Sequence, residues 1–402
     1  MFRIDSPGAA PGNVFTEGDP STGTPATVVS ADWLNAVQAE LANAIEAAGI
    51  SLDKTNDAQL LAAIRVLQSG GGSNPVGIGS NLLINGDFGI FQRATSAPSG
   101  VLTASLAAAT TAYKLDRWQS SSDGGGGAGV ATITRQAHTP GQTSVPGFPT
   151  FFARHAQTVA ATVSSPALRQ KIEGVGGIGG TVTLDCWIKA DASRNVTLKL
   201  TQTFGSGGSP DVTVGSVVFA ASTAWARARF TIALPSVSGK TFGPGDYLLV
   251  EFLMPTGATF SIDFSDAELI SSPTPALFQR RGPTVELDLC RRYFEKSWPH
   301  DVAATTCPSS YDGTTAGDAN GVSAGDRGKV VLTRFIAQKR GVPTIVWFAP
   351  SNQTAGFIDS AGGAKAVAST TNNGPASTGY PVPSSTFDAD LLAAHWTADA
   401  EL

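Results

Sequence analysis

The sequence predicts a mainly β protein in which a short N-terminal helical segment is followed by two antiparallel, jelly-roll-like β-sandwich domains. Three observations support this prediction. Glycine (45) and proline (24) are abundant in the 402 residues, only 15% of residues are charged, and apolar and polar residues alternate with a period of two from residue 81 onward. Such alternation is typical of half-buried antiparallel strands, and frequent turn residues favour many short strands. An apolar content of 42% provides enough material for cores.

Residues 1–68 form the helical segment. The first 29 residues hold four prolines and four glycines and are expected to form an extended arm. A helix then begins after Ser30 or Asp32, since either side chain can cap the first turn, and it ends at Gly49. A second helix is expected from Asn56, with Gln59 completing a capping box.

Apolar residues form a stripe on each of these two helices. A hairpin of about 38 residues cannot bury both stripes well, so a partner is required. The residues predicted to contact symmetry copies or a receiving protein are Trp33, Leu34, Val37, Leu41, Ile45, Leu60, Leu61 and Ile64.

The charge distribution separates this segment from the rest of the chain. Residues 1–80 carry three basic and eight acidic side chains, whereas residues 81–402 are neutral. Residues 69–80 are a flexible linker by their glycine and serine content. No part is basic enough to predict nucleic-acid binding. There is no apolar stretch of 18 residues and no signal-peptide pattern, so we expect no membrane insertion.

Two β domains are expected after the linker, at 81–272 and 284–402. Alternating runs at 182–188, 196–200, 230–234, 248–252 and 260–264 are predicted strands of the first domain. Thr284 can cap a helix from Val285 to about Lys296, and the second set of strands is expected at 330–332, 344–348 and 393–402. Trp118, Trp187 and Trp396 lie within strand or motif patterns and are predicted to be core residues.

Catalytic and cofactor motifs are not apparent. The glycine pattern at 174–179 matches G-x-G-x-x-G but precedes a predicted strand, so it indicates a turn and not a dinucleotide site. The four histidines show no metal-ligand spacing, and the acidic residues at 312–326 match no known calcium loop. Cys186, Cys290 and Cys307 imply neither a disulfide framework nor a zinc site. We therefore expect no cofactor, no metal and no enzymatic activity.

Three stretches resemble bacteriophage tail-fibre (receptor-binding) proteins that carry a carbohydrate-binding-module-like jelly roll. They are the segment from Gly23 to Ile50, the block from Asn81 (NLLINGDFGIFQR, then YKLDRW) to Trp118, and Glu286–Ser297 (ELDLCRRYFEKS) together with the closing Trp396–Leu402 (WTADAEL). The resemblance implies a homotrimeric fibre on the virion tail, made in the host cytoplasm and attached to baseplate or tail proteins by its N-terminus. It also implies that the distal β domains adhere to bacterial surface glycan or lipopolysaccharide. No long repeat for a fibre shaft is present.

Glycan binding requires an aromatic face for the sugar ring and planar polar groups for its hydroxyls. The loop after the C-terminal helix offers both. The candidate glycan-binding residues are Trp298, His300, Asp301, Tyr311, Asn320, Asp326 and Tyr380. Two alternatives remain open at this stage: a purely structural baseplate or tail component, and an enzyme that trims surface polysaccharide.

Overall fold

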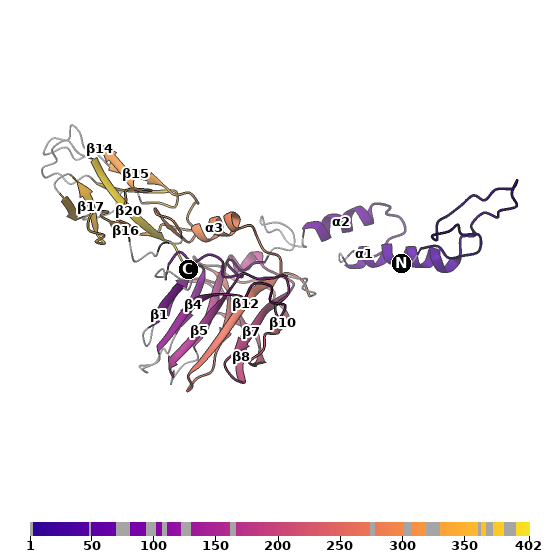
Figure 1. The fold of residues 1–402 in the computed structure, drawn as a ribbon, viewed down its shortest axis with the longest axis horizontal. Coiled ribbons are helices and arrows are strands. Elements are labelled where there is room, and N and C mark those ends of the chain that lie inside the picture. The colour runs from indigo at the N-terminus through magenta and orange to yellow at the C-terminus, as the bar shows by residue number, and fades with distance from the viewer. Residues whose placement is uncertain are drawn as a thin grey trace. The chain divides into compact units, whose positions relative to one another are not determined.

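The structure is a computed structural model that describes residues 3–47, 50–69, 81–93, 102–106, 111–121, 130–160, 166–273, 278–300, 302, 307–318, 330–360, 363–366, 373–381 and 391–402. It divides into two compact units, Met1–Ser80 and Asn81–Leu402. Within the described ranges three α-helices stand against twenty strands, which confirms the predicted mainly β class (Figure 1). The predicted linker lies almost entirely outside these ranges, and the domain limits 81–272 and 284–402 remain a prediction.

The N-terminal unit contains α1 (Ala31–Ala47) and α2 (Gln59–Ser69). The Ser30 hydroxyl accepts the backbone N–H of Trp33 at 3.3 Å, which confirms Ser30 as the cap of α1. Gly49 lies outside the described residues. The expected start of α2 at Asn56 is wrong. The Gln59 side chain bonds backbone groups of Ser51 and Asp53 and does not form a capping box.

The predicted contact residues of the two helices differ in exposure. Leu34, Leu41, Leu61 and Ile64 are exposed, at 42–53% of their surface. Trp33, Val37 and Leu60 are half-buried, and Trp33 packs edge-on against Phe15 at 5.1 Å between ring centroids. The prediction that Ile45 contacts a partner is corrected, because its side chain is buried within the chain itself.

Two six-stranded antiparallel sheets form a β-sandwich in the second unit (Figure 1). The first sheet has the order β1-β4-β5-β12-β7-β10 and the second β2-β3-β6-β11-β8-β9. The first sheet comprises β1 (Leu102–Leu106), β4 (Val130–Ala137), β5 (Phe151–Val159), β12 (Phe260–Ile270), β7 (Thr181–Ala190) and β10 (Ala226–Ala233). The second comprises β2 (Thr111–Leu115), β3 (Trp118–Ser121), β6 (Ala167–Glu173), β11 (Tyr247–Leu253), β8 (Arg194–Thr203) and β9 (Val212–Ala221).

The sandwich core is filled by the apolar phase of the alternating strands. Leu184, Cys186 and Ile188 of β7 are fully buried. Trp118 is also fully buried, with ring centroids 5.4 Å from Phe88 and 6.2 Å from Phe252, which confirms its predicted core position. Because one phase of each strand fills the core, the other phase must form the outer faces of the sandwich.

The 81–118 block clamps the sandwich. The Asn81 side chain donates to the Ala267 carbonyl at 2.8 Å and accepts the N–H of Leu269 at 2.9 Å, so it stitches the segment to β12. A Cβ atom at Gly86 would lie 2.0 Å from the Ala267 oxygen, so only glycine fits there. Asn85 adopts φ 58° and bonds the Ile90 and Asp116 carbonyls. The described residues of this motif therefore have a structural role, since they hold the segment against the sandwich.

The glycine pattern at 174–179 forms a turn, as predicted. A short 3₁₀ helix, η1 (Val175–Gly177), follows Gly174, which has φ 79°, and β7 begins four residues later. A helix N-terminus that could hold a pyrophosphate is therefore absent at this point of the described chain.

The C-terminal strands gather around β20 (Leu391–Asp399), which pairs with four other strands. Its partners are β13 (Phe294–Lys296), β14 (Thr315–Asp318), β16 (Thr344–Phe348) and β17 (Phe357–Ser360), and β17 also pairs with β18 (Gly363–Ala366). A separate pair is β15 (Val330–Arg334) with β19 (Ser377–Pro381). Trp396 is buried here, as predicted, and donates to Thr315 at 3.0 Å.

The predicted helix from Val285 to about Lys296 is too long. Helix α3 spans Pro283–Arg291, and Phe294–Lys296 form β13 instead. These three residues pair with Thr397–Asp399 of β20, so long-range sheet pairing overrides the local helical pattern. The predicted final strand also ends earlier than expected, at Asp399.

The C-terminal strands and the sandwich are joined through buried ionic contacts. Arg117 and Arg93 of the 81–118 block both pair with Glu401, and Arg93 also pairs with Asp399 at 2.7 Å. The Arg117 guanidinium lies 3.4 Å from the centroid of the Tyr293 ring. Residues from both ends of the second unit therefore meet in one cluster.

Candidate functional site

The glycan-binding residues expected from the sequence are not assembled into a described site. Trp298 is a correction: it is 4% exposed, and its ring packs edge-on against Phe348 and His395. His300 and Tyr311 are exposed. Asp301, Asn320 and Asp326 lie outside the described residues, as does the side chain of Tyr380, whose backbone belongs to β19. Trp298 is therefore a core residue, which packs with Cys307 and Phe348 and contacts His395 of β20.

A serine–histidine pair in the same region is structural. The Ser297 hydroxyl lies 2.9 Å from Nδ1 of His395, as a nucleophile beside a base would. However, His395 is fully buried, and its Nε2 lies 2.9 Å from the Ser310 carbonyl, so Nε2 must carry the proton. The hydroxyl also accepts the N–H of Trp396. The hydroxyl and both ring nitrogens thus have structural partners. The pair links neighbouring segments and does not provide an activated nucleophile.

A different surface brings aromatic and charged side chains together on the outside of the first sheet. They come from the outward phase of four adjacent strands, β5, β12, β7 and β10, and from Trp225, which directly precedes β10. We call this set the outer face; its members are Phe152, Arg154, Asp263, Ser265, Glu268, Asp185, Trp187, Lys189, Trp225, Arg227 and Arg229. The register places Trp187 beside Arg227 and Ser265, and places Asp263 beside Arg154 and Lys189.

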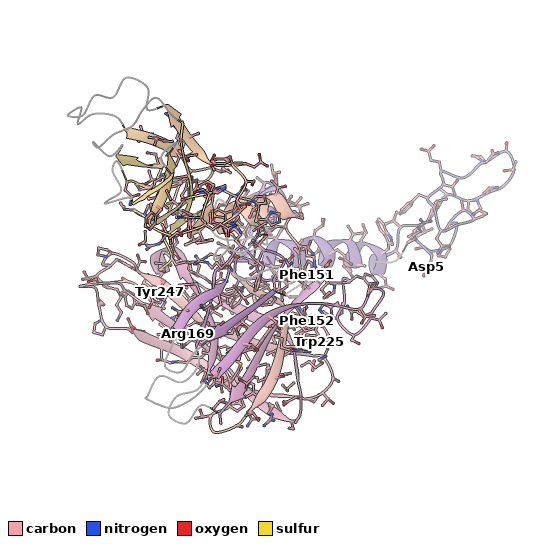
Figure 2. All side chains as sticks on the ribbon, turned by 60° about the vertical axis from the view of Figure 1, so that its left-hand side comes forward. Asp5, Phe151, Phe152, Arg169, Trp225 and Tyr247 are labelled. Atoms are coloured by element: carbon pink, nitrogen blue, oxygen red, sulfur yellow. The ribbon has the colours of Figure 1, made fainter. Side chains whose placement is uncertain are left out.

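Aromatic rings cluster at one end of the outer face. Phe152 and Trp225 lie edge-to-face at 5.4 Å, and His138, from the segment after β4, lies 4.8 Å from Phe152 and 5.3 Å from Trp225 (Figure 2). The Lys189 ammonium stands 5.2 Å from the Trp225 ring. Trp225 nevertheless keeps part of its surface exposed, and this exposed part can reach a ligand.

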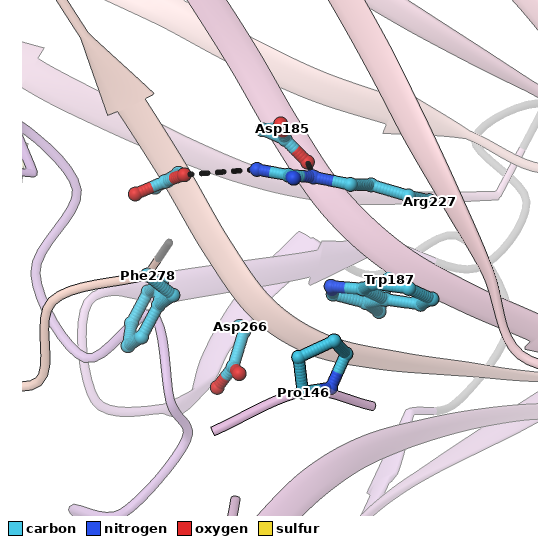
Figure 3. Close-up of a pocket in the computed structure, with 7 residues that line it drawn as sticks. Pro146, Asp185, Trp187, Arg227, Asp266 and Phe278 are labelled. Carbon is cyan, nitrogen blue, oxygen red and sulfur yellow. Dashed lines mark hydrogen bonds and ion pairs between the residues drawn. The ribbon is translucent and has the colours of Figure 1, made fainter. Parts of the chain in front are cut away.

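Beside this cluster, a shallow pocket opens around Trp187 (Figure 3). Its walls come from β7, β10 and β12 and from two flanking segments. The lining includes Asp185, Trp187, Arg227, Glu268, Pro146 and Phe278. Arg227 spans two carboxylates, with Nε 2.8 Å from Asp185 and Nη2 3.8 Å from Glu268. The pocket thus places an indole ring beside fixed hydrogen-bonding groups, and its volume of about 20 Å³ is that of about one water molecule.

Burial shifts the titration of several groups at this face. Burial and, to a smaller extent, the Lys189 ammonium lower the pKa of His138 to about 4, so the imidazole is neutral at pH 7. Burial and the nearby Asp185 raise the pKa of Glu268 to about 7. Burial also raises the pKa of Asp266 to about 6, although the Arg280 guanidinium opposes this rise. Perturbed groups in a cleft are typical of binding or active sites.

The sequence held a signal for this face that the prediction missed. Trp187 was assigned to the core, yet it lies on the strand phase opposite Leu184, Cys186 and Ile188 and is only half-buried. Large aromatic and charged residues on the polar phase of neighbouring strands are the available signal. It could be used only after the strand order was known, since β5, β7, β10 and β12 are far apart in the sequence.

Metal-ligand clusters and membrane-spanning helices are both absent from the described ranges. No three histidine, cysteine, aspartate or glutamate side chains come together there as ligands for a metal ion. No described helix combines the length and the apolar character needed to cross a membrane.

Comparisons with known proteins give similarities over part of the chain. No protein-family profile matches it. The uncharacterized protein StfP of Escherichia coli K12 is 45% identical over 73 residues, which is 17% of this chain and 35% of StfP, so the chain matches only about a third of that relative's length.

Similar solved structures include three β-rich proteins. One is a CBM4 structure (19% identity, TM-score 0.24, covering 30% of this chain and 70% of that one). Another is the enzymatically active domain of tailspike protein 4 of bacteriophage CBA120 (12%, 0.27, 47% and 21%). The third is the CBM22-1 xylan-binding domain of Paenibacillus barcinonensis Xyn10C (12%, 0.27, 50% and 97%). At identities and TM-scores of this size, these likenesses carry no argument about what the chain binds.

Proposed function

We propose that this chain is a bacteriophage tail fibre that adheres to bacterial surface glycan through the outer face of its β-sandwich. The observation that carries the glycan proposal is the combination of the half-buried Trp187 and Trp225 with fixed charged groups on the outer face. Indole rings pack against the apolar side of a sugar ring, and carboxylates and guanidinium groups bond its hydroxyls. The tail-fibre role is supported by the sequence resemblance at both ends and in the middle of the chain.

Replacing the two tryptophans tests the glycan site. Trp187→Ala and Trp225→Ala are each expected to weaken adhesion to susceptible cells and binding of their isolated surface glycan by roughly 10-fold, or about 1.4 kcal/mol, because each removes a stacking surface. Tyr247→Ala is the matched control, since Tyr247 is a half-buried aromatic residue of β11 in the opposite sheet (Figure 2). Measurements are cell binding and titration calorimetry.

The outcomes of this test separate the alternatives. Unchanged binding in both tryptophan variants, with loss in the tyrosine variant, would move the site to the other sheet. Failure of the wild-type chain to bind any host glycan would favour a purely structural tail component. Release of reducing ends from host polysaccharide would instead support the polysaccharide-trimming enzyme.

We further propose that α1 and α2 assemble the chain into a homotrimer and attach it to baseplate or tail proteins. Leu34 and Leu41 lie seven residues apart on α1 and are 53% and 45% exposed, and Leu61 and Ile64 are exposed on α2. Contiguous exposed apolar side chains mark interaction surfaces. A trimer would also multiply weak glycan contacts, since linked copies raise avidity by roughly 10²–10⁴.

The assembly proposal predicts a change in sedimentation. The wild-type chain is expected to sediment as three copies, and the double variant Leu34→Glu, Leu41→Glu as a monomer, because buried carboxylates at the interface are unfavourable. Asn43→Glu adds a charge at an exposed position on the opposite side of α1 and should leave the trimer intact. A wild-type monomer at micromolar concentration would contradict the proposal.

A further inference from the structure

Charges on the outer face are arranged in two layers. The base is formed by four carboxylates whose side chains are only 1–7% exposed: Asp185, Asp263 and Glu268 of the outer face, and the adjoining Asp266 of β12. Above them lie five cationic side chains that are 28–42% exposed: Arg154, Lys189, Arg227 and Arg229 of the outer face, and Arg280, which pairs with Asp266. The side presented to solvent is therefore cationic, although the whole chain has a net charge of −5.

The buried carboxylates hold the cations in place. Asp185 accepts from Arg227 Nε at 2.8 Å and from Arg229 Nε at 3.0 Å. Asp263 accepts from Nε of Arg154 at 2.6 Å and from its Nη2 at 2.9 Å, and it lies 3.4 Å from Lys189. Arg229 is anchored through its Nε, so the terminal N–H groups of its guanidinium are directed away from Asp185 and can bind a second anion.

Each tryptophan of the face has a cation beside it. Lys189 stands 5.2 Å from the Trp225 ring, and Arg227 is the register partner of Trp187. Arg229 is the next outward residue on β10 and, at 42%, has the most exposed side chain among these cations. A sugar stacked on an indole ring would thus place an acidic substituent next to an ammonium or guanidinium group.

Resting on the proposed glycan-binding function, we propose that the outer face selects acidic glycans, whose sugars carry carboxylate or phosphate groups. The cationic upper layer supplies charge-assisted hydrogen bonds to the acid, and the indole rings supply the stacking surface. A neutral glycan would use the rings but leave the outer donors to water. A hydrogen bond to a charged group is worth about 1.5–3 kcal/mol, so the preference should be about 10-fold or more.

Paired ligands test the selection on the full-length chain. The probes are α-1,4-linked trigalacturonate, its neutral galactose counterpart, and a phosphorylated mannose oligosaccharide, with binding measured by calorimetry at two salt concentrations. Trigalacturonate, the phosphorylated sugar or both should bind at least about 10-fold tighter than the neutral trimer, and the advantage should shrink as salt rises. The two acidic probes distinguish a carboxylate from a phosphate ligand.

The decisive variant is Arg229→Gln. It should reduce the acidic-to-neutral affinity ratio about 5-fold or more, since it removes one exposed charge. It should also preserve the fold, because Asp185 remains paired with Arg227. Lys199→Gln is the matched control: Lys199 lies on β8 of the other sheet, is 32% exposed, and pairs with the buried Glu251 at 3.3 Å. Its affinity ratio should equal that of the wild type.

The outcomes keep the two proposals distinct. Equal affinity for acidic and neutral trimers would overturn acid selection while leaving glycan binding intact. An equal fall of the acidic-to-neutral affinity ratio in Arg229→Gln and Lys199→Gln would show a general effect of net charge. That result would also overturn acid selection by the outer face. Absence of binding to every glycan, host polysaccharide included, would remove the proposed function. Tighter binding of a single-stranded DNA oligonucleotide than of any glycan would reassign the face to nucleic acid.

Discussion

Glu401→Ala should lower the free energy of unfolding by about 3–5 kcal/mol, the cost of removing one partner of a buried ion pair. Glu401 is 6% exposed and contacts Arg117 through one carboxylate oxygen and Arg93 through the other, at 3.2 Å. Arg117 is only 1% exposed. Without Glu401, the Arg117 guanidinium retains, among the described residues, the Lys171 carbonyl at 2.6 Å and the Tyr293 ring, and neither of them carries a negative charge. Because the arginines belong to the 81–118 block, the variant also weakens the junction between the sandwich and the C-terminal strands.

Asp399→Asn is the matched control for this prediction. Asp399 pairs with the same Arg93 at 2.7 Å and lies two residues away, but its side chain is 41% exposed. Solvent screening limits such a pair to about 0–1 kcal/mol. The midpoint temperature of thermal unfolding should therefore fall by about 5–10 °C for Glu401→Ala and by about 2 °C or less for Asp399→Asn. Equal decreases of the unfolding temperature in the two variants would show that the buried Glu401 stabilises the fold no more than the exposed Asp399.

A double variant separates a lost ion pair from general damage. Combining Glu401→Leu with Arg117→Met replaces both charges by apolar groups of similar length. If an uncompensated charge is the cause, the double variant should recover a large part of the stability that Glu401→Ala loses. Equal instability of the double variant would attribute the loss to packing around the Tyr293 ring.

Local patterns predicted the strands well because each strand carries its own alternation. Val182 to Ile188 and Phe260 to Phe264 needed no partner to be identified, and Ser30 was correctly assigned as a helix cap. The errors arose where a distant segment decides the outcome. Phe294–Lys296 fit a helical pattern, but pairing with β20, about 100 residues later, makes them a strand.

The outer face shows the same limit for function. The charged pairs Arg227–Asp185 and Arg154–Asp263 join residues separated by 42 and 109 positions. Nothing local indicates that β7 lies between β10 and β12. Conversely, Trp298 satisfied the local rule for a binding aromatic residue, and only the packing of Phe348 and His395 shows that it is buried.

Glu268→Gln should make the protein more stable at pH 8 and have much less effect at pH 5. The raised pKa of Glu268, about 7 against an ordinary 4.5, means that the folded state prefers the protonated acid. Its contribution to stability is therefore fully present below pH 4.5 and is lost as the pH rises through 7. A difference of this size corresponds to roughly 3 kcal/mol, which a neutral glutamine avoids.

Other groups of the sandwich impose their own pH dependence, so only the difference between variant and wild type is informative. Asp266, with its pKa near 6, acts in the same direction as Glu268. His138 and His155 act oppositely, because burial lowers both pKa values to about 4 and the folded state loses stability as the pH falls below 6.5.

Unfolding in denaturant at pH 5 and pH 8 measures the free-energy difference between the Glu268→Gln variant and the wild type. The gain of Glu268→Gln over wild type should grow by about 2 kcal/mol between these pH values. A gain that is constant with pH would mean that Glu268 is already ionised in the folded protein, with Arg227 at 3.8 Å sufficient to balance its charge.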